Sequence, residues 1–321
     1  MKRVNVKNEI LTLLGTMICC ILWGSAFSGI KIGYSLWKIP SDDTWRIIRF
    51  AGIRFFLAGI LVILFGSILK KKFLIPKKNE WPKILLLSLF QTIGQYVFFY
   101  IGLAHTTGVN SAVVDSLTVF FAILVACFLF RMEHLTFRKI IGCGLGLLGV
   151  ILINITKEGF VFHPLGDGLI ALSAFCYGIS SNMIKKYAAD HDTVLFSGHQ
   201  FILGGLIMTL FGQTGICFTR PLSDSFFASD IKVIPAVLIL VYLALVSSVA
   251  YTLWGILLRT NDVSKISVFG FMNPVIGVIL SALLLGETEA LGIRYFLALF
   301  LISAGIIIVN AKIQKEEKTK S

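Results

Sequence analysis

The sequence predicts an all-α integral membrane protein of ten transmembrane helices, arranged as two inverted repeats of five helices. Three observations lead to this fold class. Hydrophobic residues make up 56% of the chain and charged residues only 14%, whereas about a quarter of the residues are charged in soluble domains. Ten apolar stretches approach the roughly 20 residues that a helix needs to cross a bilayer. The chain also contains one sequence pattern twice, and such internal repeats define architecture.

The expected spans follow one another with short connections. They lie near residues 10–30, 50–69, 82–104, 109–130, 138–155, 167–185, 194–217, 233–257, 263–285 and 292–311. Little of the chain remains outside them. This leaves no room for a soluble catalytic domain, and the lipid bilayer is the expected surrounding.

The internal repeat divides the chain into two units. Glu133 and Glu287 occupy matching positions at an offset of 154 residues, and the same offset aligns most of the two halves. We therefore expect one five-helix unit at 1–158 and a second at 159–321. Because five is an odd number, the second unit enters the membrane in the opposite orientation. Inverted repeats of this kind recur in secondary transporters.

The formal net charge of +12 does not indicate nucleic acid as a partner. The basic residues gather at the ends of the spans, mainly in 70–83 and 131–139, and cytoplasmic loops carry such an excess of lysine and arginine. This pattern predicts a multi-pass protein of the cell membrane with both termini in the cytoplasm. The first outer loop, which contains Lys31 and Lys38, is an exception to it.

Four short elements carry a family resemblance: Trp23 to Phe27 (WGSAF), Arg54-Phe55, Asn273-Pro274 and Gly286-Glu287. With them, the chain resembles the drug/metabolite transporter superfamily, specifically the EamA-type ten-helix permeases. The resemblance implies a secondary transporter that exports or exchanges small organic metabolites, such as amino acids, through a central cavity. It also implies that the first, third, sixth and eighth helices line this cavity.

Aromatic residues on these helices are the expected cavity wall. Trp23 is near the middle of its span, where it either stacks on a substrate or packs against a neighbour, and Tyr177 takes the same place in the second unit. Tyr251 and Trp254 share one face of the span 233–257. Ser25, in the WGSAF element, is added to these expected substrate-binding residues.

Polar side chains inside the spans complete the predicted site. Gln95 must face protein or water, because an amide cannot be satisfied by lipid. Asn273 precedes Pro274, which removes a backbone hydrogen bond and predicts a break in the span 263–285. Thr118 belongs to a stripe of small and polar residues that also contains Ser111, Asp115 and Ala122.

Asp115 is the most informative single residue. It lies about 9 Å into its span at 1.5 Å per residue, where a carboxylate costs on the order of 2.5–3.5 kcal/mol on insertion scales. One hypothesis is that Asp115 binds an ammonium group of the substrate or a proton. The alternative is a structural ion pair with Arg54.

Other residues have structural interpretations. Glu133 and Glu287 are expected to hold the N-terminus of the helix that follows each of them. Gly142, Gly146 and Gly305 suit close helix packing, and they would equally suit a homodimer interface.

An enzyme is not expected. The five histidines are scattered without metal-ligand spacing, no glycine-rich phosphate loop occurs, and no metal or cofactor is predicted. The expected function is alternating-access transport of a small-molecule metabolite. The alternative is a proton-coupled multidrug-type efflux pump, in which Asp115 would carry the proton.

Overall fold

The computed structural model describes residues 6–40, 42–103, 105–106, 114–154, 163–219, 231–285 and 293–311. Within these ranges the chain is helical and contains no β-strand, so the predicted all-α class is confirmed. In chain order the elements are α1 (Val6–Leu36), α2 (Thr44–Leu69), α3 (Trp81–Ser88), η1 (Leu89–Gly94), α4 (Gln95–Leu103), α6 (Leu117–Leu124), η2 (Val125–Leu129), α7 (Phe137–Asn154), α8 (Pro164–Tyr187), α9 (Thr193–Thr219), α10 (Val233–Thr260), α11 (Val263–Ser267), η3 (Val268–Phe271), α12 (Met272–Leu285) and α13 (Ile293–Asn310).

Six helices of the described chain are long and apolar enough to cross a membrane. They span Asn8–Leu36, Thr44–Leu69, Trp81–Leu103, Thr193–Thr219, Val233–Thr260 and Ile293–Asn310. Large apolar side chains cover their outer faces. Leu64, for example, is 52% exposed and Phe300 70% exposed. Soluble proteins rarely leave so much apolar surface open, whereas a bilayer covers it, and the helices therefore describe a multi-pass membrane protein.

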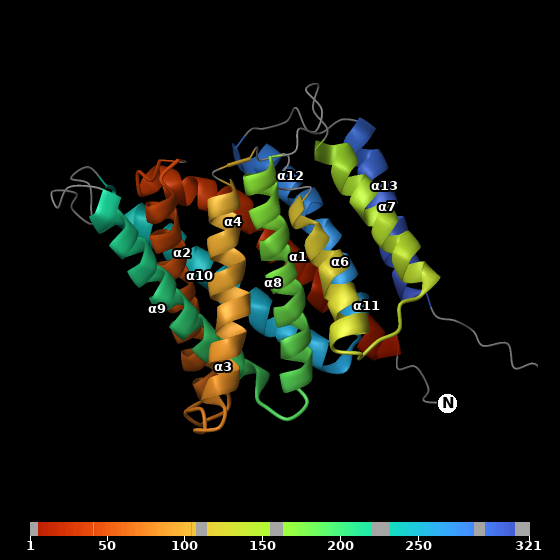
Figure 1. The fold of residues 1–321 in the computed structure, drawn as a ribbon, viewed down its shortest axis with the longest axis horizontal. Helices are drawn as coiled ribbons and strands as arrows, with labels where there is room; N and C mark the ends of the chain where they lie inside the picture. Colours follow the sequence, from red (N-terminus) through yellow and green to blue (C-terminus); the bar gives the residue numbers. More distant parts are fainter. Residues whose placement is uncertain are drawn as a thin grey trace, which may run out of the picture.

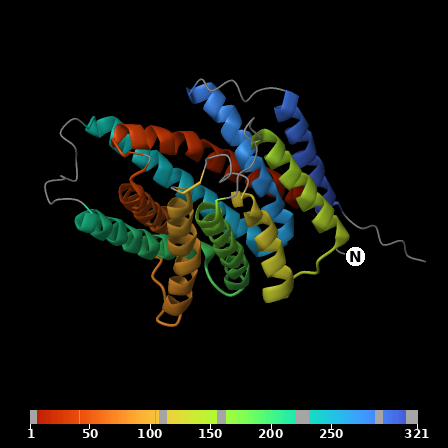
Figure 2. The same cartoon turned by 45° about the horizontal axis from the view of Figure 1, so that its top comes forward.

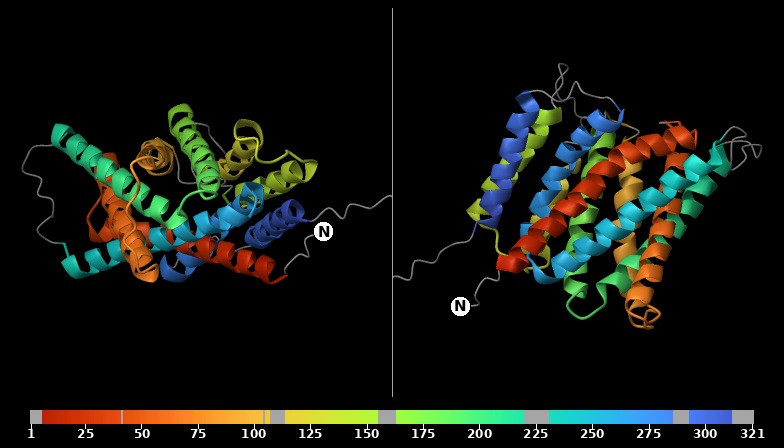
Figure 3. Two further views of the ribbon diagram at one scale, coloured as in Figure 1. Left: turned by 90° about the horizontal axis from the view of Figure 1, so that it is seen from below. Right: turned by 180° about the vertical axis from the view of Figure 1, so that it is seen from behind.

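Two helix pairs flank the bundle. The α2 helix lies along α9 at one side, and α7 lies along α13 at the opposite side (Figure 1 and Figure 3). Glycines let these backbones approach: a Cβ atom on Gly52 would lie 2.4 Å from the backbone nitrogen of Thr209. A Cβ atom on Gly142 would lie 2.7 Å from the carbonyl oxygen of Gly305. The glycines assigned to close packing therefore act within the chain, and a homodimer interface stays a prediction.

The central helices pack in a matching pattern. The α1 helix contacts α10 and α12, while α8 contacts α4 and α6. Figure 2 shows α4 beside α8 and α7 beside α13, and the right panel of Figure 3 shows α1 and α10 running side by side. The core of the molecule thus lies where α1, α4, α8 and α10 meet.

Irregular turns interrupt three of the central helices. The π-helical turn η1 separates α3 from α4 and ends directly before Gln95, and the π-helical turn η2 follows α6. The break predicted near Pro274 is confirmed as the 3-10 turn η3, which ends two residues before Asn273. Such turns occur frequently at functional positions.

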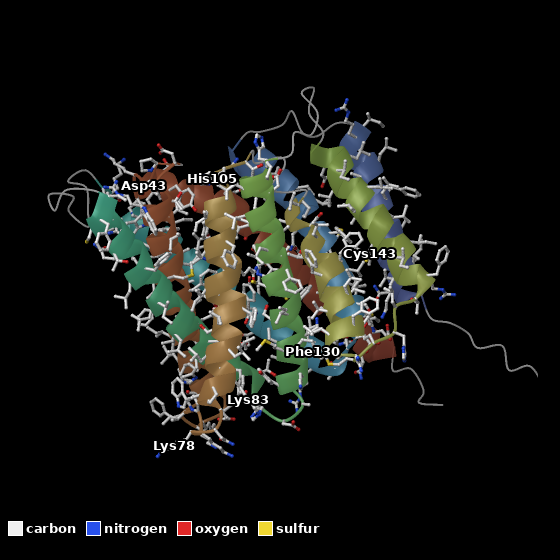
Figure 4. The ribbon with its side chains drawn as sticks, in the orientation of Figure 1. Asp43, Lys78, Lys83, His105, Phe130 and Cys143 are labelled. Atoms are coloured by element: carbon white, nitrogen blue, oxygen red, sulfur yellow. The ribbon has the colours of Figure 1, made fainter. Side chains whose placement is uncertain are left out.

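The basic segments lie at one end of the bundle. Lys78, Lys83 and Phe130 lie at the end where α1 begins, and Asp43 and His105 lie at the other end (Figure 4). The basic segments predicted for the cytoplasm and the start of α1 therefore share one end of the molecule.

Candidate functional site

Aromatic side chains from four helices meet in the core. The ring of Trp23 in α1 packs edge-on against Tyr251 and Trp254 of α10, with centroid distances of 5.1 and 4.8 Å. The hydroxyl of Tyr251 is hydrogen-bonded to the hydroxyl of Tyr96 in α4. The Tyr96 ring in turn lies 4.4 Å from Phe55 of α2. Residues from both halves of the chain therefore form one continuous aromatic cluster, which has the rigid, partly polar character of many ligand sites.

Several polar atoms of these helices lack a hydrogen-bond partner. Buried atoms without one include the indole nitrogens of Trp23 and Trp254, the Oε1 atom of Gln95 and the Oδ1 atom of Asn273. Buried polar atoms are almost always paired in folded proteins. The missing hydrogen bonds of these four atoms, on α1, α4, α10 and α12, are available to a ligand or to water.

Arg54 reaches the same region from α2. Its side chain is buried, and its Nε and Nη2 atoms donate to the Ser247 hydroxyl of α10 at 3.0 and 2.8 Å. The guanidinium carbon lies 5.1 Å from the centre of the Phe55 ring. The charge of Arg54 acts on the hydroxyl groups of Tyr96 and Tyr251, so it borders the aromatic cluster.

Asp115 does not pair with Arg54. Within the described part of the chain, its carboxylate forms no ion pair, and the guanidinium of Arg54 is held by Ser247 instead. The structural alternative for Asp115 is therefore wrong. The carboxylate is half-buried and acts electrostatically on the hydroxyls of Tyr177 and Tyr251, which places it at the edge of the cluster.

Asn273 lies at the level of Trp23. Two contacts between α1 and the η3–α12 segment bracket it: the Cys20 thiol donates to the carbonyl of Phe269 at 3.3 Å, and Gly24 packs on Ile276. A Cβ atom on Gly24 would lie 2.5 Å from the Ile276 side chain, so only glycine lets α12 come this close.

The depth of Asp115 follows from a neighbouring contact. A Cβ atom on Gly270 would lie 3.3 Å from Val119 of α6. Asp115 precedes Val119 by four residues, or about 6 Å of helix, which brings it to roughly the depth of Asn273. Thr118 is half-buried on α6, one turn from Asp115.

The remaining predicted residues divide into two groups. Tyr177 is half-buried on α8, where its hydroxyl is hydrogen-bonded to Ser181 and lies near Asp115 and Tyr96. Ser25 lies elsewhere, because two residues of helix turn it about 200° away from Trp23. It accepts a hydrogen bond from Tyr242 at 2.7 Å. Since Tyr242 is 40% exposed on the outside of α10, Ser25 faces away from the aromatic cluster.

Sequence reasoning did not assign Tyr96, Phe55 or Arg54 to the site. Tyr96 directly follows Gln95, but the sequence does not reveal that its hydroxyl meets Tyr251. Arg54 was expected only as a partner of Asp115. The signal that could have found it is a permanently charged side chain ten residues inside α2, since such residues in a membrane helix usually serve function.

Glu133 holds a helix N-terminus, although not that of the helix that follows it. Its Oε1 accepts from the Val263 amide at 2.5 Å, and its Oε2 accepts from the Ser264 hydroxyl at 2.5 Å. The following helix, α7, contributes only Lys139, whose ammonium group lies 2.8 Å from Oε2. The expectation for Glu133 is therefore wrong in its target, which is α11 of the second half. Glu287 lies outside the described residues.

The pKa of Glu133 is lower than that of an ordinary glutamate. Burial opposes its negative charge, but hydrogen bonds from Lys139 and Ser264 outweigh this effect. The carboxylate is therefore charged at neutral pH and couples the two halves at the basic end of the bundle.

Comparison with known proteins identifies the family. The chain belongs to the EamA-like transporter family, which matches residues 10–155 and again residues 164–311. The predicted resemblance is confirmed, and the chain is a membrane transporter.

Relatives agree with this assignment. A probable amino-acid metabolite efflux pump of Escherichia coli (strain K12) is 28% identical over 315 residues, and the match covers 94% of each chain. An uncharacterized transporter of Archaeoglobus fulgidus is 27% identical over 295 residues, which cover 90% of this chain and 95% of the relative. A solved crystal structure that is 19% identical has a TM-score of 0.73, covers 93% of this chain and 96% of its own, and shows the same fold.

Proposed function

We propose that this transporter exports or exchanges small organic metabolites, with amino acids as the favoured class, by alternating access of its two halves. The observation that carries the proposal is the cluster of unpaired polar atoms and aromatic rings at the centre of the bundle. Its members come from α1, α4, α10 and α12. The printed name of the Escherichia coli relative, an amino-acid metabolite efflux pump, supports the substrate class.

Ten transmembrane helices in two inverted five-helix units are part of this proposal. The 154-residue offset relates α1 to α8, α2 to α9, α4 to α10, α6 to α12, and α7 to α13. Under this exchange the α1–α10 contact becomes the α8–α4 contact, and the α1–α12 contact becomes the α8–α6 contact. The α2–α9 and α7–α13 pairs map onto themselves. A contact pattern unchanged by exchange of the halves supports a two-fold relation between them.

Alternating access follows from this arrangement. A substrate bound between two similar halves can be exposed to either side when one half rocks against the other. The basic end, where Glu133 of the first half holds α11 of the second, corresponds to the cytoplasm in this proposal. Both termini then lie in the cytoplasm of a protein of the cell membrane.

The site residues have separate roles in this proposal. Trp23, Tyr177, Tyr251 and Trp254 enclose the apolar part of the substrate, and Asp115 binds its ammonium group. Gln95, Asn273 and Thr118 supply hydrogen bonds at the same depth. Ser25 is not retained, because its hydroxyl contacts Tyr242 on the outer side of α10.

The test is efflux from proteoliposomes that contain the purified protein and a mixture of the standard L-amino acids. Wild-type protein should release one or more of them faster than protein-free liposomes do. Asp115→Asn should reduce that release at least tenfold without loss of folded yield, because the amide keeps the shape and loses the charge. The matched control is Asp262→Asn, which should leave the release unchanged, because the Asp262 carboxylate is 72% exposed at the bundle end. Equal release from wild-type and empty liposomes would contradict the proposal.

A proton-coupled multidrug-type pump is the second candidate, and one observation favours it. Within the described residues, the Asp115 carboxylate has no cationic partner, so it is available to take up a proton. Lipophilic cations that trigger proton release from purified wild-type protein, but not from Asp115→Asn, would favour this candidate over a metabolite exporter.

A further inference from the structure

The environment of Arg54 is unusual for a membrane helix. Arg54 lies ten residues, or about 15 Å, from the start of α2 and is only 3% exposed. A guanidinium group cannot lose its proton at any physiological pH, so it remains a cation within the bundle. Buried cations of this kind are costly unless an anion faces them.

The described residues do not supply that anion. Ser247, a neutral hydroxyl, accepts from two of the five N–H donors of Arg54. The other three donors form no hydrogen bond to a described side chain or carbonyl, and no described carboxylate lies within ion-pair distance. A planar guanidinium with free donors matches the geometry of a carboxylate, which it binds through two parallel hydrogen bonds.

The Asp115 carboxylate, which also acts on the cluster, is separate from this cation. Both Arg54 and Asp115 act on the hydroxyl of Tyr251, yet the two charges do not form an ion pair. Within the described part of the chain, a cation and an anion without ion-pair partners therefore both act on the aromatic cluster. Two charges held apart in a site of low dielectric select a ligand that carries the complementary pair.

We propose that Arg54 binds the carboxylate of the transported metabolite while Asp115 binds its ammonium group, so that zwitterionic amino acids are the substrate class. This inference rests on the proposed function, because it assigns the ligand of the same site. Trp23 and Trp254, whose rings are in contact, would pack on the substrate side chain, which extends away from both charged groups. The hydrogen bonds that Arg54 donates to Ser247 hold the guanidinium in place for this contact.

The experiment compares substrates that lack one charged group at a time. Proteoliposomes are loaded with a mixture of the standard L-amino acids, their carboxamides and their N-acetyl derivatives, and mass spectrometry follows the loss of each. Wild-type protein should release a free amino acid about tenfold or more faster than its carboxamide, because a polar site rejects an analogue that leaves its groups unpaired. Arg54→Gln should bring this ratio close to one.

Three further variants complete the test. Arg54→Lys keeps the charge but loses the planar fork, so its ratio should lie between those of wild type and Arg54→Gln. Asp115→Asn should reduce the preference over the N-acetyl derivative instead. Arg49→Gln is the matched control, because Arg49 lies on the same helix and donates to Gln213 at 2.8 Å. Its ratios should equal those of the wild type.

The outcomes separate this inference from the proposed function. Release of carboxamides as fast as free acids by wild-type protein, or an unchanged ratio in Arg54→Gln, overturns the role of Arg54 and leaves the transporter proposal intact. Release of none of the species by wild-type protein overturns the proposed function, and the inference falls with it. If Arg54→Gln does not fold, the release ratio of free acid to carboxamide is compared between Arg54→Lys and Arg49→Gln. A lower ratio in Arg54→Lys supports the role of Arg54, and equal ratios overturn it.

Discussion

Glu133 should contribute more to stability than any ordinary surface carboxylate. Its side chain is 4% exposed. It accepts hydrogen bonds from the Val263 and Ser264 amides, the first donors of α11, which have no partner within their own helix. Glu133→Ala leaves both donors unpaired. At about 1–3 kcal/mol for each buried unpaired donor, we expect a loss of about 2–6 kcal/mol in the free energy of unfolding.

Asp262→Ala is the control for this prediction. Asp262 occupies the N-cap position of α11, where a capping side chain is expected from local sequence. Its carboxylate makes no capping hydrogen bond, and it is 72% exposed. Asp262→Ala should therefore cost less than about 0.5 kcal/mol. Thermal unfolding in detergent, followed by loss of a monodisperse elution peak, measures both variants. Equal midpoints for the two would refute the assignment of the cap to Glu133.

The pH dependence gives an independent check. The pKa of Glu133 is lower in the folded protein than in the unfolded chain, because hydrogen bonds from Lys139 and Ser264 outweigh its burial. The folded state therefore binds this proton less tightly, and the contribution of Glu133 is complete above the ordinary pKa of about 4.3. It is lost as the pH falls through the lowered folded value. The stability difference between wild type and Glu133→Ala should shrink over this acidic range and stay constant from pH 6 to 8.

Three further predictions follow from the packing and the site. Gly205→Ala should lower the unfolding midpoint by several degrees, because a Cβ atom at this position would lie 2.2 Å from the backbone nitrogen of Phe56. Gly144→Ala is the control and should leave the midpoint unchanged, because a Cβ atom there meets nothing within 4 Å. Combining Asp115→Asn with Arg54→Gln should not restore the efflux lost in Asp115→Asn, because the two side chains are not paired; full recovery would contradict this. A cysteine introduced at Lys78 should be labelled by an impermeant maleimide only from the cytoplasmic side, and one at His105 only from outside; the reverse pattern would invert the proposed topology.

The family and the general class of structure were determined by the sequence alone. Apolar stretches of membrane length, the repeat and the basic segments depend on composition and periodicity, which are local properties. The break before Asn273 was predictable for the same reason, because Pro274 removes a backbone donor wherever it stands. Close packing through Gly142 and Gly305 was likewise visible, since small residues in membrane helices serve close approach.

Only the tertiary structure decided which of these residues meet. Ser25 and Trp23 are neighbours in one motif, but the helix turns them to different faces, so that one contacts Tyr242 and the other Tyr251. Arg54 and Asp115 were plausible partners by depth, yet their separation depends on how α2 packs on α10 and brings Ser247 to the guanidinium.

Glu133 illustrates the same limit. Its position in a turn indicated a helix cap, but which helix receives the cap depends on the contact between the two halves. Pairings between segments more than a hundred residues apart are set by packing across the whole bundle. The local sequence pattern therefore predicts which kind of interaction a side chain forms, such as a helix cap. The fold determines which distant group is its partner.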